Sequence, residues 1–296
     1  MGLDVARGCA LLGVVTMNYV AVLNARHAPW SRLEPRWLGW LLNPFRGPLT
    51  TRFALVFVVV AGMSFTLMAK RSSDHRGLRN SIAGRAALLF LLGVSFAQIW
   101  AGEILHSYAL YMAIGLLMLD APARWLAALG VAATVAAAVI QLWARDRYGA
   151  LVRPHWLLPG QLHSGSHLTG DLFAVGTHPV TPWVGFFALG MWLGRQRVHD
   201  PRVRARLAAR GGVVFVLALL AQQLGLAMVP DRWDWALSAG PYPPMPLYVI
   251  ASCGLATLIV MGILEGSARW RGAPLDWLAA AGRCSLSLYL LRTRLP

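Results

Sequence analysis

The chain has 296 residues, of which 57% are hydrophobic and only 13% carry a charged side chain. Its mean hydropathy of +0.55 excludes an ordinary soluble domain, because so apolar a surface would aggregate in water. The net charge of +15 could suit a nucleic-acid-binding protein, but the arginines are spread over several loops. The composition therefore predicts an integral membrane protein, and nucleic acid is not an expected partner.

The apolar residues fall into blocks of roughly 17 to 22 residues, which is the length that an α-helix needs to cross a hydrocarbon core of about 30 Å. We expect about nine such spans, and hence an all-α polytopic transmembrane bundle in a lipid bilayer. The predicted spans are 4–24, 50–69, 82–101, 104–120, 124–144, 180–196, 211–230, 246–265 and 276–292.

Clusters of basic residues predict how the bundle is oriented. One cluster, residues 70–85, follows the second predicted span, and another, residues 195–210, follows the sixth. The positive-inside rule places both loops in the cytoplasm, together with the N-terminus. The expected location is a multi-pass position in the cell membrane, with long outer connections at 25–49 and 145–179.

Two polar residues stand out near the end of the first predicted span. Asn18 lies deep in an apolar run, where lipid offers it no hydrogen-bond partner. A bond to a neighbouring helix would satisfy it. His27 follows the run, and histidine is the side chain whose ordinary pKa suits general-base catalysis. A lone histidine at the interface is usually just solvated, and these residue types alone leave its role undecided.

A second pair of polar residues begins the fourth predicted span. Glu103 and His106 are three residues apart, which predicts that they share one helical face. A carboxylate beside an imidazole orients the ring and raises its basicity, in a catalytic site or simply at a membrane interface. His178 precedes a Pro-rich turn, where capping or acceptor binding is the favoured interpretation. The HSGSH segment at 163–167 has weak metal-ligand spacing, and no metal site is expected.

Several motifs resemble one family of transmembrane acyltransferases. The run LDVARGCALLGVVTMNY at 3–19 and the His-Ala-Pro-Trp segment at 27–30 resemble the opening of the group that includes heparan-α-glucosaminide N-acetyltransferase. Further similar segments are FALVFVVVAGMSFTL at 53–67, ILHSYALYMAIGLLML at 104–119, HPVTPWVGFFALGMWLGR at 178–195 and AGRCSLSLYLL at 281–291. The resemblance extends in order over most of the chain.

The resemblance implies transfer of an acyl group, in particular acetyl, from cytoplasmic acyl-CoA as co-substrate. The acceptor would be a hydroxyl or amine of an extracytoplasmic glycan, lipid or small metabolite. In this interpretation His27 is the base, and Asn18 positions the thioester or the oxyanion. Glu103 and His106 form a second catalytic candidate. The candidates for binding the CoA phosphates are Arg7, Arg79 and Arg85, which could equally serve only to set the topology.

The C-terminal end departs from the family pattern. Arg292 stands where many relatives have a histidine, and relatives continue into further spans. We expect a single transmembrane acyltransferase-like domain over 1–296, with a C-terminal truncation as one explanation of this difference. The alternative function is a non-catalytic permease or export component with a polar cavity. Both functions are compatible with a homodimer.

Overall fold

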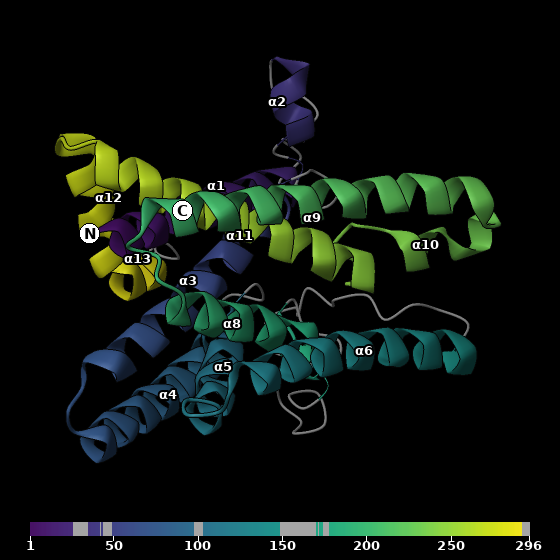
Figure 1. Ribbon diagram of the computed structural model, residues 1–296. Coiled ribbons are helices and arrows are strands. Elements are labelled where there is room, and N and C mark those ends of the chain that lie inside the picture. Colours follow the sequence, from purple (N-terminus) through teal and green to yellow (C-terminus); the bar gives the residue numbers. More distant parts are fainter. Residues whose placement is uncertain are drawn as a thin grey trace. The chain divides into compact units, whose positions relative to one another are not determined.

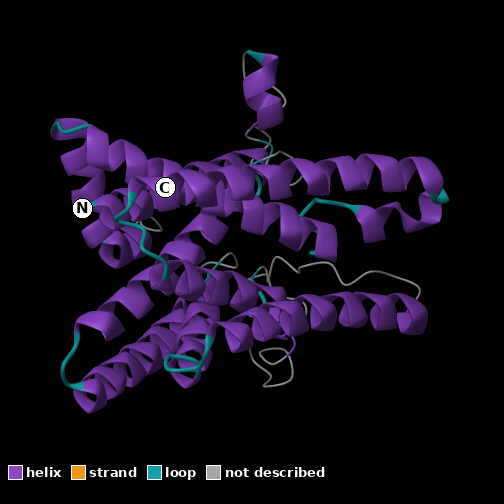
Figure 2. Cartoon of the chain, in the orientation of Figure 1, coloured by secondary structure: helices purple, strands orange, loops and turns teal. Residues whose placement is uncertain are grey.

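The computed structural model describes residues 1–25, 35–41, 43, 49–97, 103–148, 170, 172–173 and 178–291. Within these residues the secondary structure is helical and contains no strand, which confirms the all-α prediction (Figure 2). The helices, labelled in Figure 1 except for η4, are α1 (Gly2–Ala25), α2 (Arg36–Leu41), α3 (Arg52–Arg71), α4 (His75–Ala97), α5 (Leu105–Leu117), α6 (Ala123–Tyr148), α8 (Val180–Arg195), α9 (Pro201–Met228), η4 (Asp231–Trp233), α10 (Asp234–Leu237), α11 (Pro246–Arg269), α12 (Ala273–Arg283) and α13 (Ser285–Leu291).

Six helices in the described part of the chain are long and apolar enough to cross a membrane, namely α1, α3, α4, α6, α9 and α11. They correspond to six of the nine predicted spans. Helices α5 and α8 are also apolar, but they have only 13 and 16 residues. At 1.5 Å per residue they are about 20 and 24 Å long, less than a hydrocarbon core of about 30 Å. The protein is thus an integral membrane protein, and among the described helices six are long enough to be candidate spans.

The ninth predicted span, 276–292, differs from the structure. Two helices, α12 of 11 residues and α13 of 7, replace the single expected helix. The interruption lies at Cys284, which has φ −92° and ψ 17°. Neither piece is long enough to cross a bilayer alone. The apolar pattern could not show this break, because it runs on through both helices.

The chain divides into two compact units that interleave along the sequence. The first comprises Met1–Val60, Arg197–Leu224 and Ile250–Pro296. The second comprises Ala61–Gln196 and Gly225–Val249.

In the first unit, α1 packs directly against α12. Glycines allow the two backbones to touch: a Cβ at Gly8 would lie 2.9 Å from the carbonyl carbon of Leu278, and one at Gly282 would lie 2.7 Å from that of Asp4. Residue numbers rise on one helix as they fall on the other, so the helices are antiparallel. Close approach at small residues is the usual way in which membrane helices associate.

Helices α9 and α11 also pack in antiparallel fashion within the first unit. At one end, Nε of the buried Arg204 donates to Oε2 of Glu265 at 2.7 Å. Further along, a Cβ at Gly211 would lie 2.7 Å from the carbonyl oxygen of Gly254. Arg204 also donates to the backbone carbonyls of Val198 and His199, which ties the preceding loop to the start of α9.

In the second unit, α8 lies parallel to the part of α3 that belongs to this unit. The hydroxyl of Thr66 donates to the carbonyl of Met191 at 3.1 Å, and the ammonium of Lys70 donates to the carbonyl of Gly194 at 3.0 Å. Numbers rise together along both helices. If both helices enter the membrane, they enter it in the same direction, as the predicted order of spans requires.

Two connections of the second unit meet the end of α8. Arg79 forms an ion pair with Asp120 at 2.7 Å, which links the start of α4 to the loop after α5. Arg195, at the end of α8, donates to backbone carbonyls of that same loop, including Met118 and Leu119 at 3.2 Å. The loops that follow the second and fourth predicted spans therefore lie beside the end of α8, the helix of the sixth predicted span.

Candidate active site

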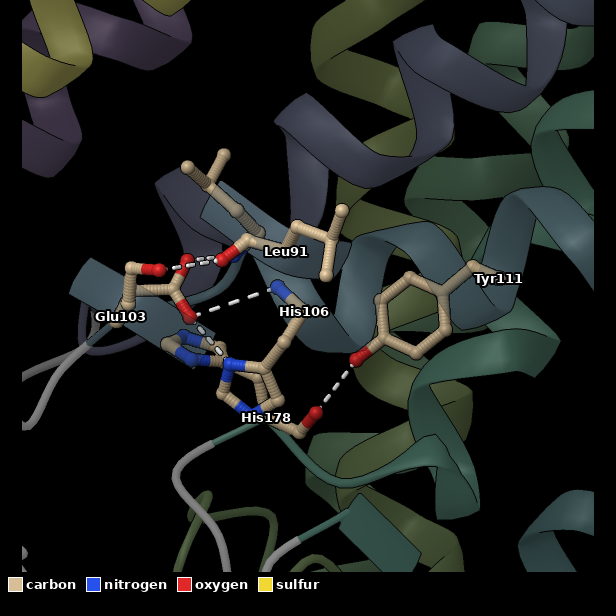
Figure 3. Close-up of polar contacts among 7 residues, drawn as sticks. Leu91, Glu103, His106, Tyr111 and His178 are labelled. Carbon is tan, nitrogen blue, oxygen red and sulfur yellow. Dashed lines mark hydrogen bonds and ion pairs between the residues drawn. The ribbon is translucent and has the colours of Figure 1, made fainter. Parts of the chain in front are cut away.

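Glu103 and His106 form a buried acid–imidazole pair at the start of α5 (Figure 3). Oε2 of the carboxylate contacts Nδ1 of the imidazole directly. The Glu103 side chain is completely buried, and that of His106 is 11% exposed. Such a pair is the type of side-chain combination that orients a histidine for acid–base chemistry.

The same carboxylate also caps helix α5. The backbone N–H of Leu105 donates to Oε1, and that of His106 lies 3.4 Å from Oε2. These are amide groups of the first helical turn, which have no carbonyl partner inside the helix. The positive end of the helix dipole and two N–H donors therefore stabilise a negative charge that burial alone would penalise.

This geometry corrects one prediction. Glu103 precedes the helix, which begins at Leu105, so Glu103 and His106 do not occupy one face of a helical turn. The two side chains meet because the carboxylate folds back over the helix start. The expected contact is present, but helix capping brings it about.

The carboxylate determines how the imidazole can act. When Nδ1 carries a proton and donates it to Glu103, the lone pair lies on Nε2. In the described part of the chain, Glu103 is the only hydrogen-bond partner of the ring. His106 can therefore accept a proton at Nε2 while Glu103 stabilises the resulting imidazolium, as in other carboxylate–histidine pairs.

Gly93 on α4 allows the backbone of His106 to approach that helix closely. A Cβ at Gly93 would lie 2.8 Å from Cα of His106 and 2.9 Å from its Cβ. Helices α4 and α5 pack against each other, so the backbone of His106 rests on the glycine without an intervening side chain. A glycine at this position lets His106 lie directly against α4.

A second polar contact joins α5 to the segment before α8. The hydroxyl of Tyr111, which is fully buried, donates to the backbone carbonyl of His178 at 2.6 Å (Figure 3). The ring of His178 packs edge-on against Trp183 with centroids 4.6 Å apart. Tyr111 was not among the predicted site residues. A tyrosine in an apolar helix was the available signal, because its hydroxyl needs a partner when buried.

Of the other predicted catalytic pair, Asn18 and His27, the structure describes only Asn18. Asn18 lies on α1 in the first unit and is half-buried. His27 lies outside the described residues, as do His163 and His167 of the HSGSH segment.

The predicted phosphate-binding arginines differ in how they are engaged. Arg7 donates to Asp4 at 3.0 Å on α1. Arg79 is paired with Asp120 and is 39% exposed. Arg85 is exposed on α4. Two of the three arginines therefore already form an ion pair with a carboxylate. Arg85 is the one of the three that forms no ion pair within the described helices.

No group of three or more metal-ligating side chains occurs among the residues that the structure describes. Acid–base chemistry by a carboxylate–histidine pair is what the described polar residues support.

These features define an integral membrane protein of α-helices with a buried acid–base pair. The chain belongs to the heparan-alpha-glucosaminide N-acetyltransferase family, because the sequence profile of that family's catalytic region matches residues 1–228. This range contains both predicted catalytic pairs, and it indicates a membrane acetyltransferase type of activity. Searches of curated proteins and of solved structures gave no significant match.

Proposed function

We propose that the protein is a membrane acyltransferase that moves an acetyl group from cytoplasmic acetyl-CoA to an acceptor outside the cytoplasm. The acceptor is a hydroxyl or amine of a glycan, lipid or small metabolite. The observation that carries the proposal is the buried Glu103–His106 pair, which lies inside the region matched by the family. The family's use of acetyl-CoA supports the choice of donor.

Acyl transfer needs a base that removes the acceptor's proton as its oxygen or nitrogen attacks the thioester carbonyl. In the proposal, His106 takes that proton on Nε2, with Nδ1 held by Glu103. The tetrahedral oxyanion then collapses, the carbon–sulfur bond breaks, and the CoA thiolate leaves. The protonated imidazole can return its proton to the departing sulfur, which balances the reaction.

His27 and Asn18 remain proposed residues of the same reaction. The resemblance of the first span gives His27 the role of base and Asn18 that of a donor to the thioester oxygen or oxyanion. The proposal thus contains two candidate histidines, and mutation of each must decide which one removes the proton.

The donor is proposed to approach from the side that carries the basic loops. Arg85 is exposed and can bind CoA phosphates, whereas Arg79 and Arg7 must share their charge with Asp120 and Asp4. The contacts among the loop before α4, the loop after α5 and the end of α8 support an alternating topology, and the density of arginine supports a cytoplasmic side. The proposed location is a multi-pass position in the cell membrane.

Turnover of acetyl-CoA by the full chain in lipid nanodiscs tests the proposal, with free CoA as the readout and amino sugars or alcohols as acceptors. We expect His106→Gln to lower turnover at least about 100-fold, the range typical of a lost acid–base group. His27→Gln, measured in parallel, assigns the base. If both variants retain wild-type turnover, neither histidine is the base. If the wild type binds acetyl-CoA with no release of CoA to any acceptor, the catalytic proposal fails.

A further inference from the structure

Helix α9 has two faces of different character along its first five turns. Arg204, Leu207, Gly211 and Ala218 are buried. At 100° per residue these four lie within roughly 60° of one another around the helix. The exposed arginines 202, 206 and 210 are spaced four residues apart and are centred roughly 130° away from the buried set around the helix. We call these three residues the arginine ladder.

The ladder continues directly into an exposed apolar stripe. Val213, Leu217, Leu220 and Leu224 have exposed fractions of 57%, 57%, 53% and 65%. At 100° per residue they and the ladder share a sector of roughly 80° around the helix. Only 11% of the residues in the most apolar 18-residue stretch of α9 are buried within the described structure. In a bilayer, this stripe faces the hydrocarbon chains of lipids.

The length of α9 places the ladder at the level of the lipid headgroups. The helix has 28 residues and is about 42 Å long at 1.5 Å per residue, against about 30 Å of hydrocarbon. When the apolar stripe occupies the hydrocarbon core, the first turns extend beyond it into the headgroup layer. Arginines at that level meet the phosphates of the surrounding leaflet.

The ladder is not used to hold the described fold together. Arg204 makes the ion pair with Glu265, whereas none of the three ladder arginines forms an ion pair with a carboxylate in the described helices. Among the described residues, the side chain of Arg206 donates to the backbone carbonyl of Arg202. Three cations at the membrane surface thus remain available for anions.

We propose that the arginine ladder and the apolar stripe together form a binding surface for anionic phospholipids, with the phosphates on the ladder and the acyl chains along the stripe. A second copy of the chain fits the surface less well. A two-fold axis along the membrane normal would set ladder against ladder at one depth, where like charges repel. A soluble anion would gain nothing from the adjoining apolar stripe.

The test compares lipid retention by the purified full chain in detergent, after mixing with equal amounts of phosphatidylglycerol and phosphatidylcholine. Captured protein is washed, and bound lipid is quantified by mass spectrometry. We expect the wild type to prefer phosphatidylglycerol, and the triple variant R202Q/R206Q/R210Q to lose about tenfold or more of that preference, given roughly fivefold per cation near an anionic surface. Unchanged circular dichroism and elution volume show that the variant is folded.

A matched variant removes the same charge elsewhere. R71Q/R76Q/R85Q eliminates three exposed arginines that do not continue into the stripe of α9, and we expect it to keep most of the preference. An equal loss in both variants, or no preference in the wild type, overturns the proposal. So does displacement of the lipid by CoA or inorganic phosphate at matched concentration, which would make the ladder a site for soluble anions.

A second copy on this surface would also be detected. In a background with Cys9, Cys253 and Cys284 replaced by alanine, Leu217→Cys in vesicles would form a disulfide between copies if the stripe were a dimer interface. Efficient cross-linking would overturn the proposal. None of these measurements depends on acyltransferase activity, so they stand or fall separately from the proposed function.

Discussion

Replacing Glu103 by glutamine tests the acid–base pair most directly, because it preserves the shape of the side chain and changes only its charge and its hydrogen bonding. In the wild type, one carboxylate oxygen accepts from the N–H of Leu105 and the other from Nδ1 of His106. A glutamine has one accepting oxygen and one donating NH2 group. If its oxygen faces Leu105, its NH2 faces Nδ1, which must then be unprotonated. The proton moves to Nε2, and His106 can no longer accept one there.

The opposite rotamer of the glutamine is no better. Its oxygen could face Nδ1, but its NH2 would then oppose the N–H of Leu105, and a buried donor would lose its acceptor. That costs about 1–3 kcal/mol of stability. We therefore expect Glu103→Gln to lower turnover between about 10²-fold, as for a lost partner of a functional histidine, and about 10⁴-fold, as for the wrong tautomer.

Acetyl-CoA turnover and thermal unfolding, measured on the same nanodisc preparations, separate the two effects. Asp120→Asn is a matched control, because it removes a carboxylate from an exposed ion pair of the same unit, where at most about 1 kcal/mol is expected. A Glu103→Gln protein that is folded and turns over within about twofold of wild type would show that the tautomer of His106 is irrelevant to the reaction.

The remaining predictions concern packing and a buried cation. Gly93→Ala should lower the unfolding temperature by an amount equivalent to about 1–3 kcal/mol and reduce turnover, because the new methyl group meets the backbone of His106. Gly84→Ala on the same helix meets nothing within 4 Å and should be neutral or stabilising, so equal losses in both would contradict this reasoning. Glu265→Gln leaves the buried guanidinium of Arg204 without a counter-charge and should lower the stability of the fold, by less than the loss of a fully buried pair because Glu265 is 25% exposed. Chemical unfolding in detergent measures the change, and unchanged stability would mean that the carbonyls of Val198 and His199 are sufficient partners for Arg204.

The fold class and most helices followed from apolar block length alone, because lipid forces a crossing backbone to satisfy its own hydrogen bonds. Block length could not show where the chain is interrupted. The apolar pattern of the last block predicts one span, but in the structure the helix is interrupted at Cys284. Helix α12 ends there, just after Gly282, which packs against α1. Hydropathy records how apolar a residue is, and says nothing about which neighbour it meets.

The candidate site was predictable in part. The spacing of Glu103 and His106 indicated a carboxylate–imidazole contact, which is present, although its geometry depends on a helix that starts two residues after Glu103. The link from Tyr111 to the carbonyl of His178 joins residues 67 positions apart. No local pattern encodes such a contact, because it depends on how two helices pack. The roles of His27 and Asn18 remain predictions.

The contact between α1 and α12 has a consequence for biosynthesis. A ribosome delivers membrane helices in order, and the second unit draws most of its residues from one continuous stretch, so its helices can associate while the chain is still growing. The first unit combines the earliest helix with some of the last. We therefore expect α1 to lie in the bilayer without α12 through most of translation. Gly8 and the carbonyl of Asp4 lack their α12 contacts during this time. During that interval, lipids or an insertion chaperone must cover the surface of α1 that α12 later contacts.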